Sequence, residues 1–187
     1  MIQNHLTTVQ AKDKKHLAIL IRKAIKQHGP KADLNFIDTS QITDMDGLFG
    51  EPNFNGDISG WDMSNVTQTN SMFDRGSFNR DVSSWGMSKV KKMDQMFYGS
   101  PFNGDISQWY VPNLESARFM FHHCPFNGDI SIWNIRNVPD YEKKNSVFCQ
   151  DMSLEGYHQY WTQRQQLIQT AQQSLPPPSN VLKLNVL

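Results

Sequence analysis

The chain has 187 residues, of which 38% are hydrophobic and 11% aromatic, and its 18 Lys and Arg residues balance 18 Asp and Glu residues. This length fits one domain, and the apolar content is enough to fill an elongated core. No stretch approaches the roughly 20 apolar residues of a membrane-spanning helix, so the sequence predicts no membrane span.

An amphipathic helix is predicted near the start of the chain, from about Asp13 to Gln27, and His28-Gly29-Pro30 should end it. The apolar residues that would share one side of it are Leu17, Leu20, Ile21, Ala24 and Ile25. Residues 1–33 carry seven Lys or Arg against two Asp, a balance of +5, whereas residues 34–148 carry nine against fourteen acidic residues, a balance of −5. A basic helix could contact nucleic acid or an anionic membrane surface. An N-terminal capping helix over residues 1–33, with a charged face in solvent, is the favoured interpretation.

The first residues have cations ahead of only a short apolar run, with no small-residue cleavage site and no lipobox cysteine. This pattern predicts a cytoplasmic protein. The alternative is a location at the cell surface, or secretion by a non-classical route.

An internal repeat then dominates the sequence. Nearly the same eight residues recur at a spacing of 24: FNGDISGW at Phe54, FNRDVSSW at Phe78, FNGDISQW at Phe102 and FNGDISIW at Phe126. A fixed period of 20 to 50 residues indicates a solenoid, because one short unit cannot bury its apolar face without stacking on its neighbours. The apolar phase extends back to Leu34, so residues 34–150 should form about five coils, the first of them degenerate.

Columns of apolar residues at this period are the predicted core. Each coil is expected to contain a turn, a short strand and a short helix. Asn55 and Gly56 would make the turn with positive φ, and Ile58 would point inward from the strand. The helix would lie near residues 66–73, where apolar residues follow helical spacing. The core columns are Trp61, Trp85, Trp109 and Trp133; Ile58, Val82, Ile106 and Ile130; Val66, Val90, Leu114 and Val138; and Phe49, Phe73, Phe97 and Phe121.

The motif F-N-x-D-[IV]-S-x-W, followed in most coils by Val or Leu and then Met-Phe, resembles the repeats of the BspA-like, mycoplasma-type leucine-rich-repeat family of bacterial surface proteins and lipoproteins. The resemblance covers roughly residues 34–148; the first coil lacks FN and Trp, and the last departs after Val138. It implies an α/β fold, a right-handed leucine-rich-repeat-like solenoid, and a role in recognition. The family has no single catalytic activity, so no functional residues carry over from it.

A second capping helix is predicted within residues 151–187, with Ser153 as its N-cap and Pro176-Pro177-Pro178 after its end. The tail beyond the prolines, VLKLNVL, could form a terminal strand. The apolar and aromatic side of this helix would be Tyr157, Tyr160, Trp161, Leu167, Ile168 and Ala171.

Two polar columns accompany the core. Asn55, Asn79, Asn103 and Asn127 are expected to bond the backbone of adjacent coils. The second column is Asp57, Asp81, Asp105 and Asp129. Like charges one coil apart repel, so three interpretations of it stay open: capping of the local turn, an acidic recognition face, or Ca²⁺ binding. Turn capping is favoured, and the nonapeptide pattern of calcium solenoids is absent.

His and Cys side chains, which commonly bind transition metals, occur in the segment His122-His123-Cys124 and again at Cys149, about one coil later. Their spacing matches no zinc signature, so zinc, a disulfide and two unpaired thiols stay open, with the thiols favoured. The sequence contains no nucleophile elbow, P-loop or dinucleotide motif. We therefore predict no catalytic, cofactor-binding or metal-binding residues and no enzymatic activity.

The expected function is a non-enzymatic protein-binding module, in the form of a bacterial or phage inhibitor or effector; the alternative is a bacterial surface, adhesin-like repeat protein. An acidic, Ser-lined face favours a basic protein partner, and nucleic acid is not expected. The residues predicted to bind the partner are Asp57, Ser59, Gly60, Asp81, Ser83, Ser84, Asp105, Ser107, Gln108, Asp129, Ser131 and Ile132.

Overall fold

The computed structural model describes residues 8–49, 53–130 and 132–133. All belong to a compact unit that spans Met1–Gln150. A second unit, Asp151–Leu187, lies outside the described residues, and so do the predicted C-terminal helix and tail strand.

Helix α1 (Lys14–His28) confirms the first predicted element. The Asp13 carboxylate accepts a hydrogen bond from the His16 amide at 2.7 Å, which satisfies one of the donors that a helix start leaves without a partner. At the other end Gly29 adopts φ 81° and donates its amide to the Ile25 carbonyl at 2.8 Å. Glycine suits this cap because φ in that range strains other residues.

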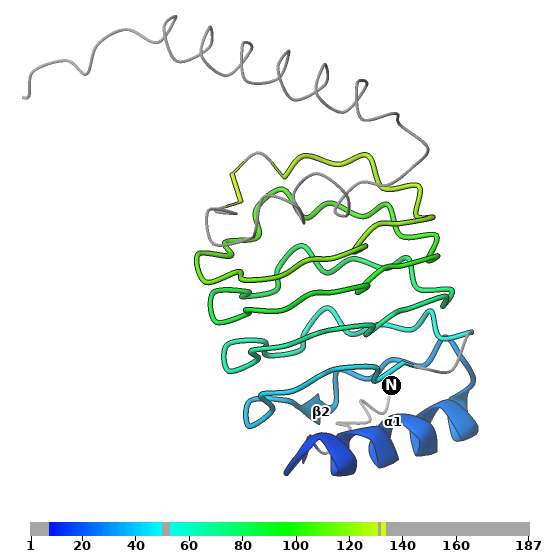
Figure 1. The fold of residues 1–187 in the computed structure, drawn as a ribbon. Helices are drawn as coiled ribbons and strands as arrows, with labels where there is room; N and C mark the ends of the chain where they lie inside the picture. Colours follow the sequence, from blue (N-terminus) through cyan, green and yellow to red (C-terminus); the bar gives the residue numbers. More distant parts are fainter. Residues whose placement is uncertain (1–7, 50–52, 131, 134–187) are drawn as a thin grey trace, which may run out of the picture. The chain divides into compact units, whose positions relative to one another are not determined.

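The buried side of α1 packs beside the first repeat (Figure 1). Leu17, Ile21 and Ala24 are buried, as their spacing predicts. Strand β1 (Val9–Gln10) precedes the helix and pairs in parallel with β2 (Ile37–Asp38), in the register Val9 with Ile37 and Gln10 with Asp38. The chain therefore enters along the first repeat and returns over it as α1. Within the described residues, no helix has the length and apolar character to cross a membrane.

Beyond β2, segments 24 residues apart lie side by side (Figure 1). Parallel bridges join Asp44 to Gln68, Gln68 to Lys92 and Lys92 to Ser116. In the middle of this series the amides of Thr69, Ser71, Phe73 and Arg75 donate to the carbonyls of Lys92, Asp94, Met96 and Tyr98, at 2.6–2.9 Å. Each repeat thus holds the next through its backbone in constant register.

The backbone of residues 66–73 differs from the predicted short helix, because it forms turns. The amides of alternate residues donate to the following repeat, so they are not available for bonds four residues back. Between them run three-residue turns, such as Met72 to Thr69 and Asp74 to Ser71. Ser71 and Arg75 have φ of 52°, which a right-handed helix excludes.

The strand predicted around Ile58 is reduced to a single bridge between Asp33 and Asp57. The Asp57 amide donates to the Ala32 carbonyl at 3.2 Å, and the Leu34 amide donates to the Asp57 carbonyl at 2.9 Å. The next carbonyl, that of Ile58, instead accepts the Trp61 amide in a tight turn. The regular pairing between repeats therefore follows residues 67–75, not residues 57–59.

The described members of the predicted apolar columns are buried, and the aromatic columns form ladders of stacked rings; Val138 lies outside the described residues. Within a repeat, the two Phe columns pair at ring distances of 4.0–4.2 Å, as Phe73 does with Phe78. Between repeats, rings of one column lie 5.2–6.4 Å apart, with planes within 14° of parallel. The core is thus continuous from one repeat to the next.

The Trp column adds a hydrogen bond to its packing. The indole N–H of Trp85 donates to the Ile58 carbonyl of the preceding repeat at 3.1 Å, and that of Trp109 donates to the Val82 carbonyl at 2.9 Å. A buried indole N–H needs such a partner. At Trp85 and Trp109 the side chain therefore fills the core and also ties the turn of the preceding repeat to its own repeat.

Gly56 has a different role from the one predicted. Neither Asn55 nor Gly56 has positive φ. A Cβ at residue 56 would lie 2.0 Å from the Ala32 carbonyl oxygen and 2.7 Å from the Phe54 ring. Glycine is required here because backbone and ring approach closely, and the expectation of a left-handed turn is wrong.

Candidate functional site

The predicted recognition residues form exposed rows along the repeats, which we call the Asp–Ser face. The Asp row is exposed at residues 57, 81, 105 and 129, and so is the variable row at residues 60, 84, 108 and 132. Between them Ser59, Ser83 and Ser107 are half-buried, and Ser131 lies outside the described residues. The structure thus brings eleven of the twelve predicted residues into two exposed rows and one half-buried row.

The Asp residues of this face close turns. An Asp57 carboxylate oxygen accepts the Ser59 amide at 2.9 Å and the Ser59 hydroxyl at 2.8 Å. The Ser83 amide donates to Asp81 and the Ser107 amide to Asp105 in the same way, both at 2.9 Å. The turn-capping prediction is confirmed at these three positions. Because the carboxylates are also exposed, capping does not remove them from the surface.

These bonds lower the pKa of the carboxyl groups. The pKa of Asp57, of Asp81 and of Asp105 is lowered, first by the amide and then by the hydroxyl of the Ser two residues later. For Asp81 and Asp105 the charge of the Asp one repeat earlier acts in the opposite direction. The local bonds prevail, so these three exposed carboxylates, which are negative at neutral pH, stay negative to a lower pH than an ordinary Asp.

Hydrogen bonds between repeats hold the backbone beneath the variable row. The Gly60 amide donates to the Asn35 side-chain oxygen at 2.8 Å. The Ser84 hydroxyl donates to the Ser59 carbonyl at 3.1 Å. A partner would therefore meet a surface whose backbone is already ordered, which lowers the entropy cost of binding.

Two large apolar side chains are exposed on either side of the buried Trp column. Ile132 precedes Trp133 and is 60% exposed, whereas Tyr110 follows Trp109 and is 65% exposed. Sequence reasoning included Ile132 and missed Tyr110. The signal for Tyr110 was present, since the position after each Trp also varies, through Asp62, Gly86 and Tyr110.

The Asn column acts as predicted. The side-chain oxygen of Asn55 accepts the Asn79 amide at 3.0 Å; Asn79 bonds Asn103, and Asn103 bonds Asn127, in the same way at 3.1 Å. Through these bonds the side chains of Asn55, Asn79 and Asn103 stabilise the stack.

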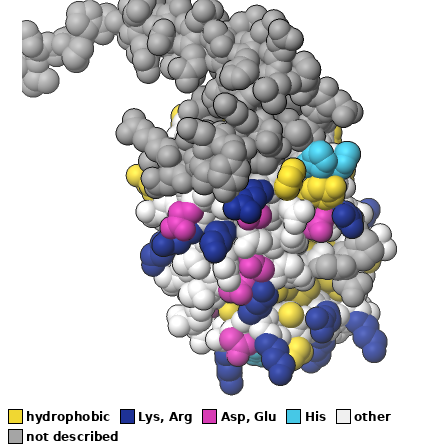
Figure 2. Space-filling view, in the orientation of Figure 1, with side chains coloured by type: hydrophobic (Ala, Val, Ile, Leu, Met, Phe, Trp, Pro, Cys, Tyr) yellow, Lys and Arg dark blue, Asp and Glu magenta, His cyan; other side chains and the backbone are white. Residues whose placement is uncertain are grey.

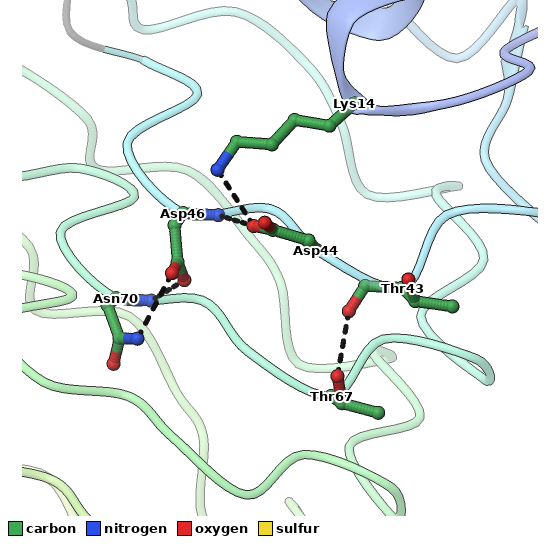
Figure 3. A network of polar contacts seen from close by, with 6 residues as sticks. All are labelled: Lys14, Thr43, Asp44, Asp46, Thr67 and Asn70. Carbon is green, nitrogen blue, oxygen red and sulfur yellow. Dashed lines mark hydrogen bonds and ion pairs between the residues drawn. The ribbon is translucent and has the colours of Figure 1, made fainter.

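A second polar ladder, which the repeat columns did not predict, runs through Asp46, Asn70 and Asp94. Figure 3 shows its first two members, Asp46 and Asn70. Asp46 accepts the Asn70 amide at 2.6 Å, and Asn70 accepts the Asp94 amide at 2.9 Å. Close by, the Lys14 ammonium of α1 lies 2.8 Å from an Asp44 carboxylate oxygen. Asp46 therefore bonds adjacent repeats and Asp44 bonds α1, whereas three Asp residues of the Asp–Ser face close their own turns and are exposed.

The structure describes three of the four residues suggested for zinc, His122, His123 and Cys124, but not Cys149, so the zinc interpretation stays open. Cys124 is buried, its sulfur lies 3.1 Å from the Phe102 carbonyl oxygen, and burial raises the pKa of its thiol to about 11. Zinc binds thiolate, which this environment disfavours. In the part of the chain that the structure describes, no three His, Cys, Asp or Glu residues are grouped to hold a metal ion. Cys149, the other half of the suggested disulfide, lies outside the described residues.

The rings near Cys124 form a small cluster of their own, in which His123 is exposed and His122 and Tyr98 are half-buried. His122 and His123 have ring centroids 4.0 Å apart, and Tyr98 of the preceding repeat lies 5.2 Å from His122. On the side drawn in Figure 2, His side chains sit beside a hydrophobic group, and acidic and basic side chains are interspersed. This surface shows no single sign of charge, unlike the Asp row.

Comparison with known proteins identifies one family. The sequence model of the family described as "Mycoplasma protein of unknown function, DUF285" matches residues 21–125 of the chain. A second match, which overlaps the first, covers residues 88–172. Overlapping matches are expected where one chain repeats its sequence. No curated protein and no solved structure matches the chain.

Proposed function

Since the chain belongs to the Mycoplasma family of unknown function, DUF285, whose description gives no activity, we propose a function from the geometry of its surface. The chain is a non-enzymatic protein-binding module that recognises its partner through the Asp–Ser face. It acts on another protein as an inhibitor or effector. The partner is a protein with a basic surface.

The proposal includes an architecture: the 24-residue repeats stack into a right-handed solenoid like those of the BspA-like leucine-rich-repeat proteins. Its support is the constant register, since the bridges from Asp44 through Gln68 and Lys92 to Ser116 each step by 24 residues. Stacked rings in every repeat from Phe49 to Phe126 add to it. Solenoids of this kind commonly present extended binding surfaces.

One observation carries the functional proposal: exposed residues change from repeat to repeat while the frame beneath them does not. Along the variable row the residue is Gly60, Ser84, Gln108 and then Ile132, all exposed. The turn beneath each keeps its Asp to Ser bond wherever the structure describes both residues. Specificity can therefore be set at these positions without disturbing the core.

The chemistry of the face fits a basic partner with an apolar contact point. The Asp row supplies negative charge, which speeds encounter and favours cationic surfaces. Tyr110 and Ile132 supply exposed apolar area of the kind that anchors protein interfaces. A surface or adhesin-like role, the alternative, would use the same face in another compartment, and the cytoplasmic location stays a prediction.

A triple variant, Asp57→Asn, Asp81→Asn and Asp105→Asn, tests the proposal without breaking the turns. Asparagine keeps an oxygen that accepts the Ser amide while it removes the charge. Glu115→Gln is the control, because Glu115 is an exposed acidic residue outside the Asp–Ser face. Its carboxylate pairs with the Lys91 ammonium at 3.2 Å. Each tagged protein captures partners from a lysate of the organism that encodes it, and the bound proteins are identified by mass spectrometry.

The expected result is a protein retained by the unsubstituted chain and by the Glu115→Gln control but lost from the triple variant, with all three chains equally folded. Loss on Tyr110→Ser as well would extend the contact from the Asp row to the position after each Trp. An identical set of bound proteins for all variants would refute recognition by the Asp–Ser face.

A further inference from the structure

A cavity of about 580 Å³ lies between α1 and the start of the first repeat, and its lining residue Asp33 is bridged to Asp57 at one end of the Asp–Ser face. Pockets that hold small molecules have volumes of about 300–1,000 Å³, so this one is large enough for a ligand. Its apolar lining comes from β1, α1 and the segment before β2, and consists of Val9, Leu20, Ala24, Ala32 and Phe36.

The polar lining of this α1 cavity is mainly basic. Lys23 and His28 extend from the helix and Lys31 from the loop after it, and all three are exposed. Asp33 is the one carboxylate among the lining residues, and it already accepts the Asn35 amide at 2.9 Å. Lys and Arg side chains gather at the end of the molecule where α1 lies (Figure 2). An apolar space with cations at its mouth selects for a molecule that is apolar at one end and anionic at the other.

We propose that the α1 cavity binds an amphipathic anion, with a carboxylate or similar head at Lys23 and Lys31 and a short chain or ring among the apolar side chains. Burial of that chain drives binding, and the two ammonium groups orient the head in solvent. This ligand differs from the protein partner of the Asp–Ser face, because the two surfaces attract opposite charges. The same chemistry occurs in a free fatty acid and in an anionic membrane lipid.

Fluorescence of 8-anilinonaphthalene-1-sulfonate, itself an amphipathic anion, tests the proposal on the full chain. Saturable binding at one site is expected, with displacement by decanoate and not by decylammonium or acetate at the same concentration. Near-ultraviolet circular dichroism is recorded in parallel, because this dye also binds loosely packed states.

Charge reversal locates the site. Lys23→Glu and Lys31→Glu should each weaken dye and decanoate binding at least tenfold. Lys26→Glu is the control: it makes the same change three residues along α1, at an exposed position outside the cavity lining, and should alter affinity less than twofold. Since both lining lysines are exposed, their variants should fold, and each checks the other.

Vesicles of phosphatidylglycerol distinguish the two sources of the ligand. Cosedimentation that Lys23→Glu abolishes and Lys26→Glu preserves would assign a membrane lipid, whereas decanoate binding without cosedimentation would assign a free acid. Equal effects of Lys23→Glu and Lys26→Glu, displacement by decylammonium as readily as by decanoate, or no saturable binding would each overturn the proposal.

Discussion

At Asp57, Asp81 and Asp105 one carboxylate has two roles, since an oxygen closes the turn to the following Ser while the group faces solvent. Substitution by alanine or lysine would remove the cap together with the charge. Only asparagine separates the two roles, so the turn and the negative surface can be measured independently.

Stability should therefore depend on pH through these groups. A carboxylate whose pKa is lowered by folding contributes stability above its unfolded pKa of about 3.9, and this contribution is lost as pH falls through the lower folded value. We expect the urea midpoint of the unsubstituted chain to fall below about pH 4, and that of the triple Asn variant to fall less steeply. The pKa values of Asp38 and Asp44 are also lowered, so part of the pH dependence of the urea midpoint should remain in both chains. Equal slopes between pH 2 and 6 would contradict this account.

Backbone strain gives a second prediction at this scale. Gly47 has φ of 60° and lies at the same repeat position as Ser71 and Gln95, which also have positive φ. Gly47→Ala should destabilise the chain by about 1 kcal/mol, because a Cβ is strained in the left-handed region. Gly86→Ala is the control, since Gly86 lacks positive φ, and at both glycines a Cβ would meet nothing within 4 Å. Chemical denaturation should show a loss for Gly47→Ala alone.

At the scale of elements, the helix was predictable and the repeat backbone only in part. The start, apolar stripe and end of α1 are local signals, carried by Asp13, Leu17 and Gly29, so sequence alone located it. In residues 66–73, by contrast, alternate backbone amides donate hydrogen bonds to carbonyls of the following repeat. Helical spacing among Val66, Thr69 and Phe73 could not reveal this, because three-residue turns place side chains at similar intervals.

The ring ladder is the element that should respond most to substitution. Phe97 is fully buried, 5.4 Å from Phe73 and 5.8 Å from Phe121 in the adjacent repeats. Phe97→Ala should cost about 3–5 kcal/mol in the free energy of unfolding, as large-to-small changes in a packed core do. Phe119→Ala, at a side chain that is 41% exposed, should cost far less. Similar losses for the two variants would show that the ladder is not the core.

For the molecule as a whole, the repeat period predicted which residues are buried and which are exposed, because the core columns and the Asp and variable rows each keep one environment among the described residues. The Trp, Ile and Phe columns are core, and the Asp and variable rows are surface. The α1 cavity could not be predicted, since it depends on how helix and first repeat meet and follows no period. Tyr110 was missed because the columns were defined by similarity, and the residue after each Trp differs between repeats.

If the repeats are interchangeable units of one stack, a whole period can be removed. Deletion of residues 79–102 joins Phe78 to Asn103 and leaves every column in phase, with Asn103 able to bond Asn55. This chain should fold cooperatively with lower stability, because one interface is lost. Deletion of residues 79–98, which breaks the phase, should leave the chain unfolded by circular dichroism. Equal behaviour of the two deletions would contradict the stacked-repeat architecture.

The central claim is that the Asp–Ser face binds a protein, and amide hydrogen exchange of the chain with and without its captured partner tests it most directly. When the partner is bound, we expect slower amide exchange in peptides covering residues 57–60, 81–84 and 105–110 of the Asp–Ser face. Exchange in residues 88–99 and 115–123, which lie outside that face, should change little. Protection confined to residues 88–99 and 115–123 would contradict the claim.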